Sequence, residues 1–138
     1  MPIALPKHPL PFAQGAFFIL SGLWPIIHIK SFEEITGPKV DRWLTKTLGG
    51  LITVVGSALV AGSFEEKQTP SLRSLGLGSA LALGFSDSWY SLKGRISKVY
   101  LWDALVEAAL VTAWAIEPSQ QVRKTKGNKR PKAKKKRR

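Results

Sequence analysis

Four long runs of apolar and small residues dominate the sequence and limit the folds open to it. A helix needs ~20 mostly apolar residues, at 1.5 Å rise per residue, to cross the ~30 Å hydrocarbon layer of a membrane. The second run carries no charge, whereas the third contains Asp87 and the fourth contains Asp103 and Glu107. We therefore expect four membrane spans, two of them with internal acids. They lie at about residues 12–29, 47–64, 74–92 and 99–116.

The alternative is a soluble four-helix bundle, in which each helix has an apolar stripe backed by a charged face. The stretches "LGGLITVVGSALVAG" and "LGLGSALALGF" are instead apolar or small on every side. A soluble chain of 138 residues can hardly cover such surfaces, so we favour the membrane. The predicted fold class is all-α, with a four-transmembrane-helix bundle at residues 1–117 and a tail at residues 118–138.

The connection between the first two spans has helix signals of its own. In "SFEEITGPKVDRWLTK", Ser31 and Glu34 have the spacing of a capping box, and Gly37 followed by Pro38 is typical of a helix end and a new start. We expect a short interfacial helix, a turn, and an amphipathic helix that leads into the second span.

The segments "GLWPIIHIKSFEEITGPKVDRWLTKTLG" and "GRISKVYLWDALVEAAL" resemble a set of small bacterial four-span membrane proteins, known mainly as open reading frames. The likeness covers most of residues 14–116, and "TGPKVDRWL" is its most specific part. The resemblance implies a bacterial inner-membrane protein. It implies no activity, cofactor or catalytic residue, and the basic tail is an addition to the usual pattern.

Small residues recur every fourth position in two of the apolar runs. Lipid supplies no hydrophobic drive between helices, so close helix association depends on small side chains. We expect these stripes to be helix-packing faces. They are Gly49, Thr53, Ser57 and Ala61 in the second run, and Gly76, Ala80, Gly84 and Ser88 in the third, with Ser74, Gly78, Ala82 and Ser86 beside the latter.

The three acids inside the last two spans are the strongest functional signal. Asp87 and Asp103 are expected at matching depth near one surface, and Glu107 lies one turn deeper on the face of Asp103. A carboxylate at the bilayer centre costs ~3 kcal/mol, so Glu107 should face the bundle interior and be protonated or partnered, with the hydroxyls of Thr53 and Ser57 as candidates.

These acids define a candidate polar pocket at the end of the bundle opposite the termini. One interpretation is structural, with Asp87 and Asp103 paired to the basic turn of Lys93, Arg95 and Lys98. The other is a small-ligand, ion or proton site, because ionisable groups in spans often mark function. No spacing typical of metal ligands is present, so no metal site is predicted. The predicted pocket residues are His28, Asp87, Arg95, Tyr100, Asp103 and Glu107.

The tail is strongly basic. Eleven Lys or Arg and no acid follow Val122, and they supply most of the net charge of +12. Such a segment is expected to be disordered. Although the shorter connections count the other way, it favours cytoplasmic termini and binding to anionic lipid headgroups. Nucleic acid is less favoured as a partner, because no aromatic residues interleave to stack bases.

The sequence contains no nucleophile with a paired base, no phosphate loop and no cofactor signature. We therefore expect a non-enzymatic inner-membrane helper or interaction protein, packing against another membrane protein or a second copy of itself. One alternative is a small transporter, or a ligand- or proton-binding membrane protein that uses the carboxylates. Another is a soluble nucleic-acid binder that relies on the tail.

Overall fold

The computed structural model describes residues 4–118, so the predicted tail lies, apart from Pro118, outside the described residues. The described chain is all-helical, with five helices and no strand, which confirms the predicted all-α class. Each of the four apolar runs forms a helix, and a short helix lies between the first two. The helices are α1 (Pro9–Ile27), α2 (Ile29–Thr36), α3 (Arg42–Gly62), α4 (Pro70–Leu92) and α5 (Tyr100–Ile116).

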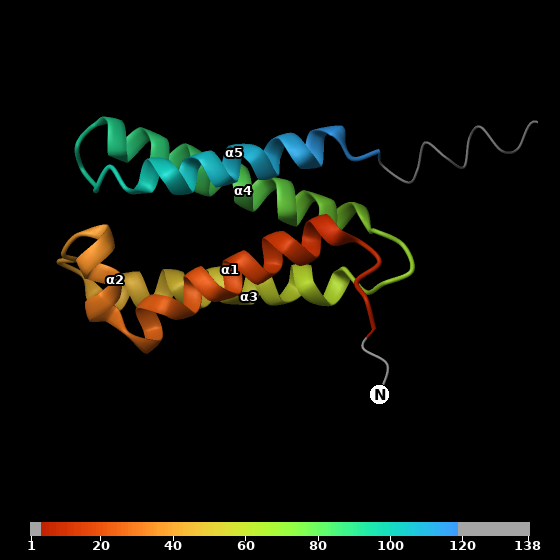
Figure 1. The fold of residues 1–138 in the computed structure, drawn as a ribbon, viewed down its shortest axis with the longest axis horizontal. Helices are drawn as coiled ribbons and strands as arrows, with labels where there is room; N and C mark the ends of the chain where they lie inside the picture. The colour runs from red at the N-terminus through yellow and green to blue at the C-terminus, as the bar shows by residue number, and fades with distance from the viewer. Residues whose placement is uncertain (1–3, 119–138) are drawn as a thin grey trace, which may run out of the picture.

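The four long helices form two antiparallel pairs, one layered on the other (Figure 1). Helices α1 and α3 make one pair, with α2 across one end, and α4 and α5 make the other. Contact is extensive within each pair and sparse between the pairs. We call the end that carries α2 and residues 93–99 the α2 end. The opposite end, where α1 begins and α5 finishes, is the termini end.

Two glycine pairs bring the backbones of α1 and α3 into direct contact. Gly15 faces Gly56, and a Cβ added to Gly15 would lie 2.6 Å from the carbonyl oxygen of Gly56. Gly22 faces Gly49 in the same way, each glycine blocking a Cβ on the other. The absence of side chains at these four positions therefore sets the separation of the two helices.

The stripe predicted for α3 is only half used in this packing. Gly49 is buried and Thr53 half-buried, whereas Ser57 and Ala61 are exposed and the buried positions are Gly56 and Leu59. At 3.6 residues per turn, a four-residue repeat drifts around the helix, while the seven-residue spacing of the glycines stays on one face. Ser57 and Ala61 therefore lie outside the face of α3 that packs within the described residues, and their packing against another helix stays a prediction.

The stripe predicted for α4 faces α5. Gly76 and Ala80 are buried, and a Cβ on Gly76 would lie 2.6 Å from the indole Cε2 of Trp114. Farther along, a Cβ on Gly84 would lie 3.0 Å from the Cβ of Glu107, and Ser88 is half-buried. The small residues of α4 thus admit the larger side chains of α5.

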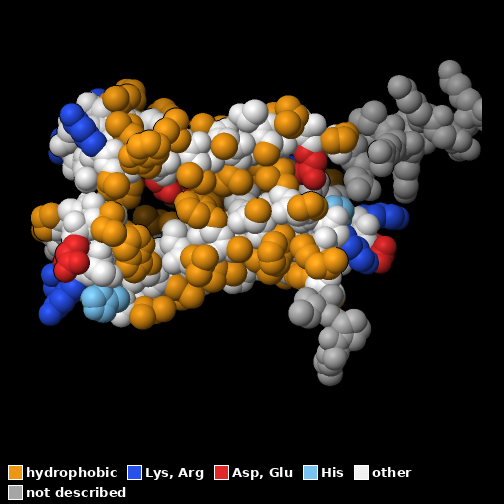
Figure 2. Space-filling view, viewed as in Figure 1, with side chains coloured by type: hydrophobic (Ala, Val, Ile, Leu, Met, Phe, Trp, Pro, Cys, Tyr) orange, Lys and Arg blue, Asp and Glu red, His pale blue; other side chains and the backbone are white. Residues whose placement is uncertain are grey.

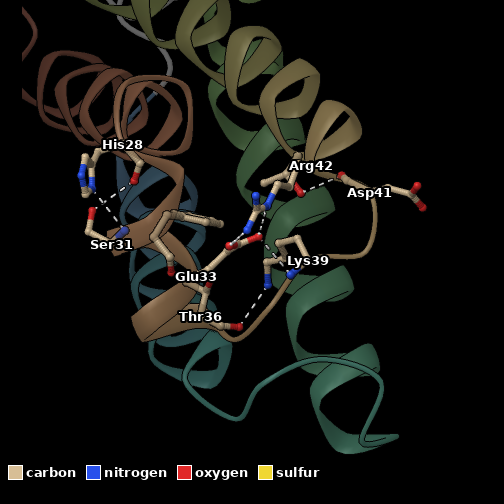
Figure 3. A network of polar contacts seen from close by, with 9 residues as sticks. His28, Ser31, Glu33, Thr36, Lys39, Asp41 and Arg42 are labelled. Atoms are coloured by element: carbon tan, nitrogen blue, oxygen red, sulfur yellow. Dashed lines mark hydrogen bonds and ion pairs between the residues drawn. The ribbon is translucent and has the colours of Figure 1, made fainter.

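The predicted capping box at the start of α2 is wrong. The helix begins at Ile29, so Ser31 lies inside it, and His28 is the cap: its Nδ1 accepts the backbone N–H of Ser31 at 3.2 Å (Figure 3). Gly37 ends α2 with a φ of 85°, a conformation that favours glycine. Residues 37–41 are not helical, and the next helix starts at Arg42, four residues after Pro38.

Of the described helices, α1 and α3 are long and apolar enough to cross a membrane by length and composition. Hydrophobic side chains nevertheless cover the length of both helix pairs, and charged side chains gather mainly at the two ends (Figure 2). Large exposed apolar side chains occur on all four long helices. Examples are Leu20, Leu51, Val54, Phe85, Trp102 and Leu105.

Candidate functional site

A cavity of about 270 Å³ lies between the two helix pairs, toward the α2 end. Helices α1 and α3 give it an apolar wall that includes Phe17, Phe18 and Ile52, and α4 and α5 provide the three acids. Figure 2 shows the hollow between the pairs, with acidic side-chain atoms at its margin. The sparse contact between the pairs at this end leaves the cavity open.

Glu107 is the most deeply placed of the acids. Its side chain is 1% exposed, and within the described residues neither carboxyl oxygen has a hydrogen-bond partner. The hydroxyls predicted as its partners are used elsewhere: Thr53 donates to the carbonyl of Gly49 and Ser57 to the carbonyl of Thr53, both at 2.8 Å. A buried polar group without a partner is costly, so Glu107 is available to whatever enters the cavity.

Asp87 and Asp103 lie together on facing helices. Asp87 is buried, and it lines the cavity together with Asp103. The two carboxyl groups therefore place oxygen atoms that can accept hydrogen bonds on the same wall of the cavity.

The predicted ion pairs between these acids and the basic turn are not formed. Among residues 4–118, the ion pairs within 4.0 Å are Lys7 with Glu66 and Arg42 with Glu33. Lys93 instead places its Nζ 4.3 Å from the ring centre of the exposed Trp89. The acids thus face the cavity rather than the turn beside them.

The cation at the mouth of the cavity is Lys39, which the sequence analysis did not identify. Its Nζ donates to the carbonyl oxygen of Thr36 at 3.0 Å and lies 4.9 Å from the ring centre of Tyr100 and 5.7 Å from that of Phe32. Two aromatic rings and a carbonyl thus hold an alkylammonium group here. The only sequence signal was a lysine directly after Gly37 and Pro38, which count as turn residues.

The backbone of Lys39 is positioned by a network outside the apolar runs (Figure 3). Arg42 donates from Nε and Nη2 to the two oxygens of Glu33, at 2.9 and 2.7 Å, and the backbone N–H of Lys39 donates to Glu33 at 3.3 Å. The hydrogen bonds from Arg42 hold the pKa of Glu33 below its ordinary value of 4.5. Glu33 therefore joins α2, the connection and the start of α3.

Two predicted pocket residues do not line the cavity. His28 is exposed and caps α2, and Arg95 borders an adjoining depression that shares Lys39 with the cavity. The structure does bring together the other four, which come from α4 and α5. They are Asp87, Tyr100, Asp103 and Glu107.

A fully satisfied polar contact joins the two helix pairs closer to the termini end than the cavity. Gln14 is completely buried and donates from Nε2 to the carbonyl oxygen of Gly76 at 2.8 Å, while Trp114 donates to its Oε1 at 2.6 Å. Arg73 also donates to the backbone carbonyls of Trp114 and Glu117. A lone glutamine in the apolar run "PFAQGAFF" was the signal that could have identified this junction.

The acids are spread along one wall of the cavity rather than gathered at a point. Within residues 4–118, no three His, Cys, Asp or Glu side chains are close enough to hold one metal ion. The arrangement is an apolar chamber with carboxyl groups on one side and an ammonium at its mouth. Comparison with known proteins gives no match to a family model, a curated protein or a solved structure.

Proposed function

We propose that the chain is an integral protein of the bacterial inner membrane with four spans, α1, α3, α4 and α5. The length and composition of α1 and α3 support this. The exposed surface of the other pair supports it as well, because Phe85 and Trp102 are 67% and 72% exposed. Apolar surface of this extent has no aqueous cover in a single chain.

The proposed orientation in the membrane depends on which side holds the two termini. Four spans place both termini on one side, and the eleven basic residues of the tail favour the cytoplasm and contact with anionic headgroups. The α2 end, and with it the mouth of the cavity, then faces outward. This proposal groups the chain with the small bacterial four-span proteins that it resembles.

Topology is testable without background labelling, because the chain contains no cysteine. Glu34→Cys in α2 and Lys67→Cys in the connection between the pairs replace exposed side chains at opposite ends. A membrane-impermeant maleimide should label Glu34→Cys on intact spheroplasts, and Lys67→Cys only after permeabilisation. Equal labelling of both, or release of the protein by alkaline carbonate, contradicts the proposal.

Within that membrane frame, the geometry best supports a protein that binds a small solute or a proton. The observation that carries this proposal is Glu107, a fully buried acid that lines the cavity with both oxygens unpartnered. Ionisable groups inside spans are expensive and usually functional. The role agrees with a small transporter or a ligand-binding membrane protein.

Dicyclohexylcarbodiimide, which reacts with protonated carboxyl groups in apolar surroundings, tests this role. Treatment of the full chain in vesicles should give one major adduct, located by mass spectrometry at Glu107 and absent from Glu107→Gln. Glu65, exposed in the connection between the pairs, is the internal control. Failure to modify Glu107 under conditions that leave the protein folded contradicts a reactive, accessible acid.

A membrane interaction role is the second candidate, and one surface favours it. On α4, Ser74, Gly78 and Ala82 are exposed in a row, and a Cβ on Gly78 would meet nothing within 4 Å. Such a stripe suits a helix of a second copy or of another membrane protein. Gly78→Leu should keep the fold and reduce crosslinked assemblies in the membrane; unchanged assemblies would remove this candidate.

A further inference from the structure

We propose that the cavity takes an organic ammonium cation with an apolar body. This inference rests on the proposed binding role of the cavity and deepens it by naming a ligand class. Its basis is the combination of the unpartnered carboxyl group of Glu107, the apolar walls and an aromatic mouth that already holds an ammonium group.

Size and wall chemistry point to an organic molecule. The cavity of about 270 Å³ has room for about nine water molecules at ~30 Å³ each, which is the scale of a small organic solute. The wall opposite the acids is formed by hydrocarbon side chains, including Phe17, Phe18, Leu48 and Ile52. Apolar surface of this kind is filled well by carbon and poorly by a hydrated ion.

The polar groups of the cavity select a hydrogen-bond donor. The hydroxyls of Ser21 and Thr45 line the wall, but each donates to a backbone carbonyl of its own segment. Glu107 offers two free oxygens, and Asp103, one turn away on α5, and Asp87 on α4 add carboxyl oxygens to the same wall. A ligand that donates several hydrogen bonds and carries positive charge matches this set.

Lys39 shows that the mouth suits an alkylammonium group. Its Nζ rests against Tyr100 and Phe32, yet within the described residues it makes no ion pair with any cavity acid. The carboxyl groups therefore lack a cation of their own. A ligand ammonium between Glu107 and Asp103, ~6 Å apart along α5, would supply one, with its carbon body against α1 and α3.

The test uses the purified full chain in micelles and isothermal titration calorimetry. The probe is 2-phenylethylammonium chloride, and its matched controls are the neutral 2-phenylethanol and the anionic 3-phenylpropanoate. We expect saturable binding of the ammonium after correction for empty micelles. The affinity for each control should be lower than the affinity for the ammonium by about tenfold or more. Sodium and magnesium chloride should compete only through ionic strength.

Variants connect this binding to the acids. Glu107→Gln should lower the affinity for the ammonium by about tenfold, whereas Glu65→Gln, at an exposed site, should leave this affinity unchanged. Asp103→Asn is the second variant, used if Glu107→Gln fails to fold. Equal affinity for ammonium and alcohol overturns the inference, as does ammonium binding that neither variant weakens.

The outcomes also separate this inference from the proposed function. If carbodiimide modifies Glu107 but the ammonium gives no saturable binding, the ligand class is wrong and the reactive acid stands. If carbodiimide does not modify Glu107 and the ammonium does not bind saturably, both proposals fail.

Discussion

The indole N–H of Trp114 donates a hydrogen bond of 2.6 Å to Oε1 of Gln14, 100 residues earlier in the chain. Through its Nε2 the same side chain reaches the carbonyl oxygen of Gly76, so one buried amide joins α1, α4 and α5. These contacts lie toward the termini end, and the cavity lies toward the other. The molecule is closed at one end and open at the other because polar contacts between the pairs are concentrated at the closed end.

Replacing Gln14 with leucine should destabilise the protein. The substitution keeps a similar volume but leaves the buried N–H of Trp114 without an acceptor, which costs about 1–3 kcal/mol. The carbonyl oxygen of Gly76 also loses a donor, but it keeps the hydrogen bond from Ser79 at 3.1 Å, so this loss costs less. The free energy of unfolding by sodium dodecyl sulfate in mixed micelles measures the loss.

A double-mutant cycle with Trp114→Phe isolates the hydrogen bond from the packing of the two side chains. Trp114→Phe removes the donor, so Gln14→Leu should cost less in that background than in the wild type. Equal costs in the two backgrounds would mean that the hydrogen bond contributes nothing.

Adjacent glycines of α3 should respond oppositely to alanine. Gly49→Ala would push a methyl group into the backbone of α1 at Gly22, and such overpacking costs about 1–3 kcal/mol. Gly50 has nothing within 4 Å of an added Cβ, so Gly50→Ala should be neutral or stabilising by up to about 1 kcal/mol. The same mixed-micelle unfolding assay compares them, and equal effects would refute the close contact of α1 and α3.

The existence of these helices could be predicted from composition, but their contacts could not. Apolar runs of helical length indicated all four long helices. Of the small residues in α4, Gly76 and Ala80 are buried, whereas Ser74, Gly78 and Ala82 are exposed. The partner of each face was not predictable, because exposed positions and helix-facing positions are equally apolar here. The spacing of Gly15 with Gly22 and of Gly49 with Gly56 held the information that the four-residue stripe obscured.

The pair formed by Glu33 and Arg42 should give a pH-dependent contribution to stability. Arg42 lowers the pKa of Glu33 below 4.5, so the contribution is fully present above that value and is lost as the pH falls through the lower, folded pKa. The thermal midpoint of the wild type should exceed that of Glu33→Gln at about pH 7, and this difference should shrink in acid below 4.5.

Glu34→Gln is the matched control for this measurement, since Glu34 is an exposed neighbour on α2. It should change the midpoint little at any pH. A wild-type advantage over Glu33→Gln that grows in acid would show that the sign of the linkage is wrong.

Removing the charge of Lys39 should strengthen binding of an organic ammonium. Lys39→Met keeps a long side chain between Phe32 and Tyr100 but removes a like charge from the mouth, an effect of ~1 kcal/mol or about fivefold in affinity. Titration of 2-phenylethylammonium measures it. Lys46→Met, at an exposed site on α3, is the control, and weaker binding to Lys39→Met alone would oppose the prediction.

The candidate site was predictable where it depends on one helix and its neighbour, and not where it depends on a connection. Asp103 and Glu107 share a face of α5, so periodicity was enough to group them. Lys39 and Arg95 both follow turn residues, and only the path of each connection decides which reaches the cavity. Glu33 and Gly37 set that path through contacts that local sequence spacing does not reveal.

The pairing of α1 with α3, and of α4 with α5, has a consequence for biosynthesis. Each pair is a continuous segment of the described chain, and the glycine contacts that bring two helix backbones together, at Gly15, Gly22, Gly49 and Gly56, lie wholly within the first pair. That pair can assemble while the ribosome is still making α4. The second pair then forms its own contacts and docks onto a finished hairpin, with Gln14 as its anchor.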